Sequence, residues 1–562
     1  MSHSRFRAGV VQTLARLGDL DYNIALVEQY TAEAVRQGAE LVVFPECMNT
    51  GYLFDSAEHA RQLAEPVDGR FVSAMAALCR KHGIYIASGF TEWDPKHGAI
   101  FNTGLLLDRR GEIIVHYHKQ FLATHDQNWF AFGINGCPVV DTDLGRIGLL
   151  ICFDGRIPEI ARCLALQGAE VLVDMANFFA MDQAEMWGPA RAYENGVWLV
   201  AATKAGHERS IYYPGGSMIV DPRGQVRGML PYDTHGVLVD DVDPAEARDK
   251  TWFAGDDRFR DRQPLAYGIL ALPHDETPVA GIETIPLIPA ASTSKVAACQ
   301  MHVSAEIDED AIFAQVSHAA KLGIKIITLP EYAFFAEWSP DAETIKRATP
   351  LAALTEKAVA IAAAYDCVIA LPHVDNDGGP LAPLTRLVGN DGVIGDYRKV
   401  HLTARERQWA AAGSAFPVFE TRFGRVGVMM GYDGCFPEAS RALAVGAADI
   451  ILWPTALRHR QEREWLMVPR AADNRCALVV ANRLDCPYPG GSVVVPPSGF
   501  PQWDVNAMAP RTMAMGAVMP AFLDLAVARQ KQMIPKVHMF RNRLTATYAP
   551  LTDTAAVLRA AE

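Results

Sequence analysis

Short apolar runs alternate with amphipathic segments along the chain. Arg7–Gln12 and Leu41–Phe44 are apolar runs of strand length, and residues 21–37 between them repeat apolar residues at helical spacing. Ile147–Cys152 is a further apolar run, and Pro158 then suits the first turn of a helix. Runs of this kind are typical of strands that are covered on both faces of a sheet. The pattern predicts an α/β layered domain.

The pattern occurs twice. Three stretches of the first copy recur in the second: LVVFPE as IITLPE, HYHKQFL as DYRKVHL, and GRIGLLICFDGRIPEIAR as GRVGVMMGYDGCFPEASR. A repeat of this length indicates two copies of one domain. We therefore expect a first domain at 1–270, a proline-containing linker at 271–293 and a second domain at 294–562.

Composition and charge narrow the class of protein. Hydrophobic residues make up 50% and charged residues 21%, which is an ordinary globular composition. The formal net charge is −13 and no strongly basic block occurs, so neither nucleic acid nor membrane is an expected partner. No apolar run is long enough to span a membrane, the N-terminus lacks the apolar core of a signal peptide, and the ten cysteines include no CxxC pair. These features predict a cytoplasmic protein with reduced thiols.

Cys152 is the first candidate for chemistry. It ends an apolar strand directly before the turn FDGR, and such a strand-to-helix turn can expose a nucleophile. The N–H of Phe153 would then be placed to face an oxyanion. Taken alone, Cys152 is better explained as a buried core residue, because cysteine is among the most buried residue types.

Glu46 and Lys119 each have two interpretations as well. Glu46 follows an apolar strand, so it is either a solvated rim carboxylate or a partly buried general base with a raised pKa. Lys119 is either a solvated edge lysine or a cation beside Cys152 that favours the thiolate and then the oxyanion.

The sequence does not predict a metal site. His116 and His118 alternate on one probable strand, with His125 nearby. No carboxylate or cysteine falls at a recognised ligand spacing, and the second copy has Asp396 and Arg398 at the matching positions.

The ordered set Glu46, Lys119 and Cys152, within FPE, HKQ and ICFDGRIPE, resembles the signature blocks of the nitrilase superfamily of carbon–nitrogen hydrolases. This resemblance implies two tandem four-layer αββα sandwiches. It also implies Glu46 as general base, Cys152 as nucleophile and Lys119 as stabiliser of the tetrahedral intermediate, with no cofactor. The expected activity is hydrolysis of a small linear amide or N-carbamoyl compound through a cysteine thioester, with nitrile hydrolysis as the alternative.

The resemblance also suggests supporting residues. Family members often carry a second glutamate seven residues after the lysine; Glu406 takes that place in the second copy and Asp126 in the first. Arg156 would clamp a substrate carboxylate or pair with Glu159. Asn177 is a candidate for lining the pocket.

The second copy lacks the nucleophile. Glu331 and Lys399 are present, but Gly431 stands where the first copy has Cys152. Cys435 lies too far along the chain to substitute, so we expect a degenerate second site. The second copy would then serve as an intramolecular partner of the first, with further homo-oligomers possible. A binding or regulatory pseudo-enzyme is the remaining alternative for the whole chain.

Overall fold

The computed structural model describes residues 5–123, 125–282, 293–301, 303, 307–376, 379–499, 503–504 and 517–555. The chain divides into two compact units. Unit 1 comprises Met1–Lys250 and Ile534–Glu562, and unit 2 comprises Thr251–Met533. Residues 251–270, which the sequence assigned to the first domain, therefore belong to unit 2. Of the predicted linker, 271–282 lie in unit 2 and 283–292 lie outside the described residues.

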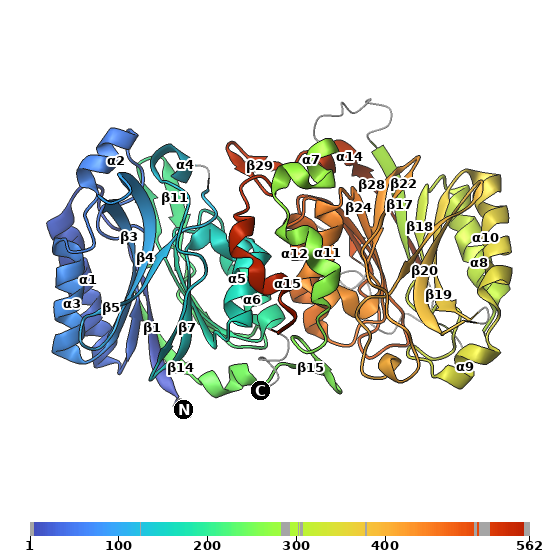
Figure 1. Cartoon of the computed structure of the whole chain (residues 1–562), viewed down its shortest axis with the longest axis horizontal. Helices are drawn as coiled ribbons and strands as arrows, with labels where there is room; N and C mark the ends of the chain where they lie inside the picture. The colour runs from blue at the N-terminus through green and yellow to red at the C-terminus, as the bar shows by residue number, and fades with distance from the viewer. Residues whose placement is uncertain are drawn as a thin grey trace. The chain divides into compact units, whose positions relative to one another are not determined.

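Unit 1 is a four-layer sandwich in which helices cover the outer faces of two packed sheets (Figure 1). The first sheet has the strand order β14 (Gly236–Val242), β1 (Phe6–Gln12), β2 (Leu41–Val43), β3 (Tyr85–Asp94), β4 (Ala99–Leu107) and β5 (Ile113–His118). The second has the order β13 (Val226–Met229), β12 (Met218–Val220), β9 (Trp198–Thr203), β8 (Val171–Ala176), β7 (Gly145–Leu150) and β6 (Val139–Thr142). The main helices are α1 (Leu20–Arg36) and α3 (Arg70–His82) on the first sheet, and α5 (Pro158–Leu166) and α6 (Gly188–Asn195) on the second.

Unit 1 also contains smaller elements. They are α2 (Ala57–Leu63), α4 (Asp126–Trp129) and the hairpin of β10 (Ala205–Glu208) and β11 (Ile211–Pro214).

The predicted elements of the first copy are confirmed. The run Arg7–Gln12 forms β1, the periodic segment 21–37 forms α1, and Pro158 begins α5. The Asp19 carboxylate caps α1 by accepting the N–H of Tyr22. The apolar faces of α1 and α3 pack on the first sheet to form one buried core.

Unit 2 repeats this architecture, which confirms the expected pair of αββα sandwiches (Figure 1). Its first sheet has the order β21 (Gly392–Arg398), β20 (Ala382–Gly389), β19 (Val368–Asp375), β18 (Ile326–Thr328), β17 (Thr293–Gln300) and β28 (Ala517–Asp524). Its second has the order β22 (Val418–Thr421), β23 (Gly424–Val428), β24 (Ile450–Pro454), β25 (Ala477–Ala481), β26 (Val493–Val495) and β27 (Trp503–Asp504). Its helices include α8 (Glu309–Lys321), α9 (Ala342–Arg347), α10 (Leu351–Tyr365), α11 (Pro437–Val445), α12 (Met467–Ala472) and α14 (Leu525–Arg529).

The segment that follows each copy in the sequence completes the other unit. In unit 2, the 3₁₀ segment η4 (Pro264–Ala271) packs on α11, and Arg262 Nε donates to Glu438 Oε1 at 2.9 Å. In unit 1, α15 (Ala549–Thr552) packs on α5, and Arg543 Nε donates to Glu159 Oε1 at 2.9 Å. Arg262 and Arg543 therefore make the same kind of buried contact with a glutamate, one in each unit.

Other elements of these exchanged segments are short. They are β15 (Thr251–Phe253), β16 (Asp256–Asp257) and α7 (Pro278–Ile282) in unit 2, with β29 (Gln532–Ile534), β30 (Val537–His538) and η10 (Thr545–Thr547) near the C-terminus.

All ten cysteines are buried and free. Among the described residues, no helix combines the length and the apolar character that crossing a membrane requires.

Candidate active site

Three strand ends of unit 1 deliver the predicted site residues. Glu46 comes shortly after β2, Lys119 directly after β5, and Cys152 begins the 3₁₀ turn that follows β7. Each residue is at most 5% exposed. The sequence thus located all three at strand ends, and the fold buries them.

A buried charge network joins two of these residues to a third predicted one. Lys119 Nζ lies 2.7 Å from Glu46 Oε1 and 2.8 Å from Asp126 Oδ2. The Asp126 carboxylate also accepts the backbone N–H of Ala123 at 2.8 Å. Asp126 is therefore a fixed partner of the lysine rather than a solvated loop acid.

Asn102 and Tyr52 complete this network. The sequence did not predict Asn102, whereas Tyr52 belongs to the stretch after Glu46 that was a candidate for lining the pocket. Asn102 Nδ2 donates to Glu46 Oε1 at 2.5 Å and lies 3.5 Å from Asp126 Oδ1. The Tyr52 hydroxyl donates to Asp126 Oδ1 at 2.8 Å. Asn102 lies in the middle of β4, where a polar residue within an apolar run was the available signal.

Cys152 sits in a left-handed backbone conformation, with a φ of 52°. Its Sγ lies 3.5 Å from the carbonyl oxygen of Asn177, and its backbone N–H donates to Asp174 Oδ1 at 2.7 Å. Asp154 braces the turn by accepting the N–H groups of Ile151 and Phe121 at 3.1 and 2.9 Å. Such a conformation is costly for a non-glycine residue and is held here by surrounding hydrogen bonds.

Burial dominates the electrostatics of the site. It raises the pKa of Glu46, with the nearby negative charge of Asp126 adding to the effect and Lys119 opposing it. Burial lowers the pKa of Lys119, but the carboxylates of Asp126 and Glu46 outweigh it and hold that pKa well above its usual value. The site therefore holds an ammonium beside a carboxylate that is poised to accept a proton.

The Cys152 thiol is protonated in the free site. Burial and then the charge of Glu46 raise its pKa well above the usual value, although Lys119 lowers it. Lys119 favours the thiolate, as expected, but its effect on the pKa of Cys152 is smaller than the effect of burial or of Glu46. Burial also raises the pKa of Asp174 to about 8 and that of Asp154 to about 6.

The other predicted residues have mixed outcomes. The ring of Phe153 stacks on Phe121 with centroids 5.4 Å apart. Arg156 forms an ion pair with Asp182 and lies over the ring of Trp187, 4.1 Å from its centroid. Its expected pairing with Glu159 stays a prediction, and Glu159 Oε1 accepts from Arg543 Nε at 2.9 Å.

Asn177 is a buried polar group with unused hydrogen-bonding capacity. Within the described part of the chain, neither its amide nitrogen nor its amide oxygen has a hydrogen-bond partner, and the residue is 0% exposed. An unpaired buried amide is costly, so such a group points to a ligand or water that completes it.

The matching site of unit 2 keeps the charges without the thiol. Lys399 Nζ lies 2.8 Å from Glu331 Oε1 and 2.6 Å from Glu406 Oε1. Gly431 has a φ of 48°, close to that of Cys152. A Cβ atom at Gly431 would lie 2.3 Å from both carboxylate oxygens of Glu331, so the glutamate occupies the space of the absent side chain.

Cys435 lies beside Arg458 and Glu462, which also line the cavity of this second site. Its Sγ faces Arg458 and Glu462 at 3.9 and 3.7 Å, and burial raises its pKa well above the usual value. Trp453, whose counterpart in unit 1 is Asp174, donates its indole N–H to the Gly431 carbonyl at 2.9 Å. The cavity lined by Glu331, Lys399 and neighbouring residues measures about 20 Å³, which is room for one water-sized occupant.

One group of side chains among the described residues has the spacing of metal ligands, and it lies apart from these residues. It consists of Glu92, His116 and His118.

Known proteins are similar to this chain in sequence. The family model described as Carbon-nitrogen hydrolase matches residues 7–250 and 295–506. A nitrilase of Pyrococcus abyssi is 33% identical over 262 residues, which cover 46% of this chain and 98% of that protein. An (R)-stereoselective amidase of Pseudomonas sp. is 31% identical over 225 residues, covering 39% of this chain and 78% of that protein. The crystal structure of an amidase from Nesterenkonia sp. is similar at 28% identity and a TM-score of 0.39, covering 44% of this chain and 94% of that chain.

Proposed function

The chain belongs to the carbon–nitrogen hydrolase family, and from this premise we propose that unit 1 hydrolyses a small linear amide or N-carbamoyl compound through a thioester on Cys152. As a member of that family it is a hydrolase that acts on C–N bonds. The observation that carries the finer proposal is the buried Glu46–Lys119–Asp126 network beside a complete nucleophile position.

The first step of the reaction forms a tetrahedral intermediate on Cys152. Glu46 accepts the thiol proton as Sγ of Cys152 attacks the carbonyl carbon, because the raised pKa of Glu46 suits it as a base for a neutral thiol. An ammonium has three N–H donors, and two of those on Lys119 serve Glu46 and Asp126. The third is left for the oxyanion, with the N–H of Phe153 as a second donor.

The later steps form the thioester, hydrolyse it and release the products. Protonated Glu46 returns its proton to the leaving nitrogen, the C–N bond breaks, and ammonia or an amine departs. Glu46 then takes a proton from water, whose oxygen attacks the thioester carbonyl. The C–S bond breaks, the proton returns to sulfur, and the carboxylic acid leaves.

The surroundings of the network favour a small substrate. The cavity that Cys152 lines, with Asp174 and Phe178, measures only about 10 Å³. A second cavity, of about 440 Å³, is lined by Leu53, Phe54, Asp55, His125, Trp129 and Arg209 and includes none of the network residues. The ring of Trp129 packs edge-on against Tyr52 with centroids 5.4 Å apart, and the hydroxyl of Tyr52 bonds to Asp126. We assign the unpaired amide of Asn177 to the substrate's own amide group, since the two are complementary donors and acceptors.

We further propose that unit 2 is catalytically inactive. Gly431 offers no nucleophile, and the carboxylate of Glu331 fills the space where one would lie. Its surviving charges are consistent with a structural ion-pair network. Nitrile hydrolysis remains the second candidate for unit 1, and the 33% identical nitrilase supports it.

Ammonia release from paired substrates tests the proposal. Wild type, Cys152→Ala and Gly431→Ala are each mixed with primary amides, N-carbamoyl amino acids and the nitriles that match the amides. We expect wild type and Gly431→Ala to release ammonia from the amide or carbamoyl set, and Cys152→Ala to release none. Release from the nitriles alone would favour the nitrilase alternative, and unchanged release by Cys152→Ala would refute the assignment of the nucleophile.

A further inference from the structure

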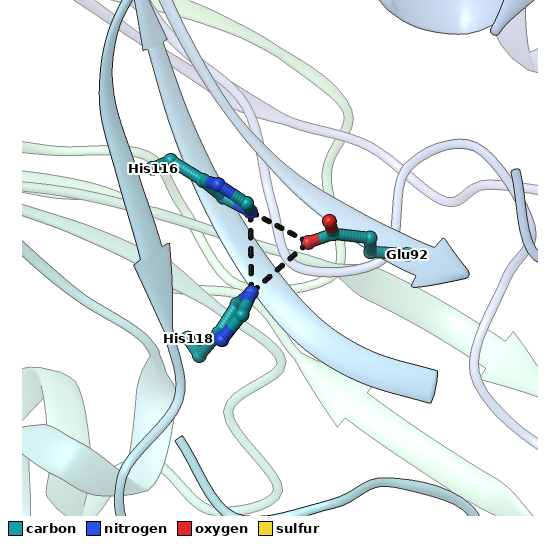
Figure 2. A group of neighbouring side chains, drawn as sticks. All are labelled: Glu92, His116 and His118. Atoms are coloured by element: carbon teal, nitrogen blue, oxygen red, sulfur yellow. Dashed lines mark hydrogen bonds and ion pairs between the residues drawn. The ribbon is translucent and has the colours of Figure 1, made fainter. Parts of the chain in front are cut away.

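Three side chains of unit 1 converge on one face of the first sheet (Figure 2). We call Glu92, His116 and His118 the Glu–His–His cluster. Glu92 lies on β3 and the two histidines on β5, with β4 between them. Phe101 of β4 pairs with Glu92, and its neighbour on the same face, Thr103, pairs with His118. Strand alternation therefore aims all three side chains at the same point.

The three converging atoms are mutually close. His116 Nε2 and His118 Nε2 lie 2.7 and 3.2 Å from Glu92 Oε2, and 3.2 Å from each other. Each ring nitrogen has one position, which holds either a proton or a lone pair. If both nitrogens carry protons, two N–H groups face each other. If only one carries a proton, the lone pair of the other faces the carboxylate. If neither carries a proton, two lone pairs face each other and both face the carboxylate. No arrangement of protons satisfies all three contacts.

We propose that this cluster binds a divalent transition-metal ion of the Zn²⁺ type. One cation satisfies three converging lone pairs at once. For a triangle with these three sides, an ion about 2.1 Å from every atom would sit about 1 Å above their plane. The ion would then have a fourth coordination site for water, on the side that faces away from the three ligand atoms. Two imidazole nitrogens and one carboxylate oxygen are a ligand set that zinc commonly takes.

The surroundings hold the ligands in place. Glu92 and His118 have side chains only 4% and 2% exposed, whereas His116 is 36% exposed and leaves a path from solvent. The Thr103 hydroxyl donates to Glu92 Oε2 at 2.6 Å, and the ring of His118 stacks on Phe101 at 3.9 Å. These contacts hold the Glu92 carboxylate and the plane of the His118 ring, whereas Nδ1 of His118 has no hydrogen-bond partner among the described residues.

At the matching positions of unit 2, the side chain of an arginine supplies the positive charge. Sheet register places Asp375 opposite Ala382, as Glu92 lies opposite Phe101, and Asp396 and Arg398 replace the histidines. Arg398 forms an ion pair with Asp375 at 2.7 Å, so the carboxylate already has its positive charge. In unit 1 no arginine or lysine takes that place among the described residues, and the bound ion would supply the charge.

The expectation of no metal site rested on spacing along the chain. His116 and His118 were visible as a pair, but Glu92 reaches them only through the pairing of three strands. A ligand contributed across a sheet leaves no local signature in the sequence. Because Lys119 follows His118 directly, an ion here would also fix the end of β5 that delivers the lysine to the active site.

Metal titration of the full-length chain tests the proposal. ZnCl₂ is titrated by calorimetry into protein freed of metal by dialysis against a chelator, and CoCl₂ is followed by visible absorption. His116→Gln is the test variant, since its exposed site tolerates the change. His97→Gln is the matched control, because His97 lies in the β3–β4 turn and also faces a carboxylate, that of Asp94, but belongs to no group of three ligands among the described residues.

We expect one tightly bound ion per chain, a Co²⁺ spectrum of nitrogen and oxygen ligands, and affinity at least about tenfold weaker in His116→Gln but unchanged in His97→Gln. A Glu92→Gln variant, checked for folding by circular dichroism, should lose affinity in the same way. The proposal fails if wild type binds no ion or if both cluster variants retain full affinity. It also fails if the Co²⁺ spectrum shows the thiolate charge-transfer band of a cysteine site.

Discussion

The arginine near the C-terminus should stabilise the unit at the beginning of the chain. Arg543 and Glu159 have side chains only 1% and 2% exposed, and their contact lies within unit 1. Arg543→Met keeps most of the aliphatic stem but removes the guanidinium that pairs with the buried carboxylate. Breaking a buried ion pair on one side costs about 3–5 kcal/mol. We expect this loss in unit 1, although Arg543 follows unit 2 in the sequence.

Hydrogen–deuterium exchange with mass spectrometry locates the loss. At about 1.4 kcal/mol for each tenfold change, a loss of about 3 kcal/mol speeds exchange through global opening by about 100-fold. We expect that increase in peptides of β7 and α5 for Arg543→Met. The matched variant Arg262→Met should instead speed exchange in α11, where Glu438 lies. Faster exchange in unit 2 for Arg543→Met, or no change in either unit, would refute the exchanged-segment arrangement.

Three further outcomes follow from the two sites. Glu46→Gln should lower kcat/KM by about 10²–10⁴-fold. It should also remove the acid limb of the wild-type pH profile, which lies above pH 4.5 because the carboxylate must be ionised and its pKa is raised. Gly431→Cys in a Cys152→Ala background should restore no ammonia release and should lower the melting temperature, because its Cβ meets the Glu331 carboxylate. The stability of unit 1 should fall as pH rises from about 4 towards about 8. The reason is that Asp174 ionises near the ordinary aspartate pKa of 3.8 in the unfolded chain but keeps its proton up to a pKa of about 8 in the folded protein. Urea titrations should show that the stability of Asp174→Asn depends less on pH.

Local pattern was sufficient for the elements and for the residues at their ends. Apolar runs predicted β1, β2 and β7, and the polar residues that end or follow such runs are Glu46, Lys119 and Cys152. A strand end is a feature of the local chain, because the apolar run stops where the sheet stops. The repeat then predicted the second sandwich and its missing thiol at Gly431.

Contacts across strands and between distant segments could not be predicted in this way. Asn102 and Tyr52 reach the site from a strand centre and a loop, and Glu92 reaches the histidines through two strand pairings. Arg543 contacts Glu159 from almost the other end of the chain. Each of these contacts depends on strand register or on where the C-terminal segment packs. Neither produces a periodic pattern in the sequence. The protonated state of the thiol likewise depends on burial that only the folded structure defines.

The central claim is a covalent intermediate on Cys152, and intact-protein mass spectrometry tests it most directly. Wild type, Cys152→Ala and Gly431→Ala are quenched within the first turnovers of each amide or N-carbamoyl substrate. The account predicts one acyl adduct per chain on wild type and on Gly431→Ala, with the mass of the substrate minus ammonia or amine, and none on Cys152→Ala. Turnover that continues in Cys152→Ala, or an adduct that maps to another residue, would contradict it.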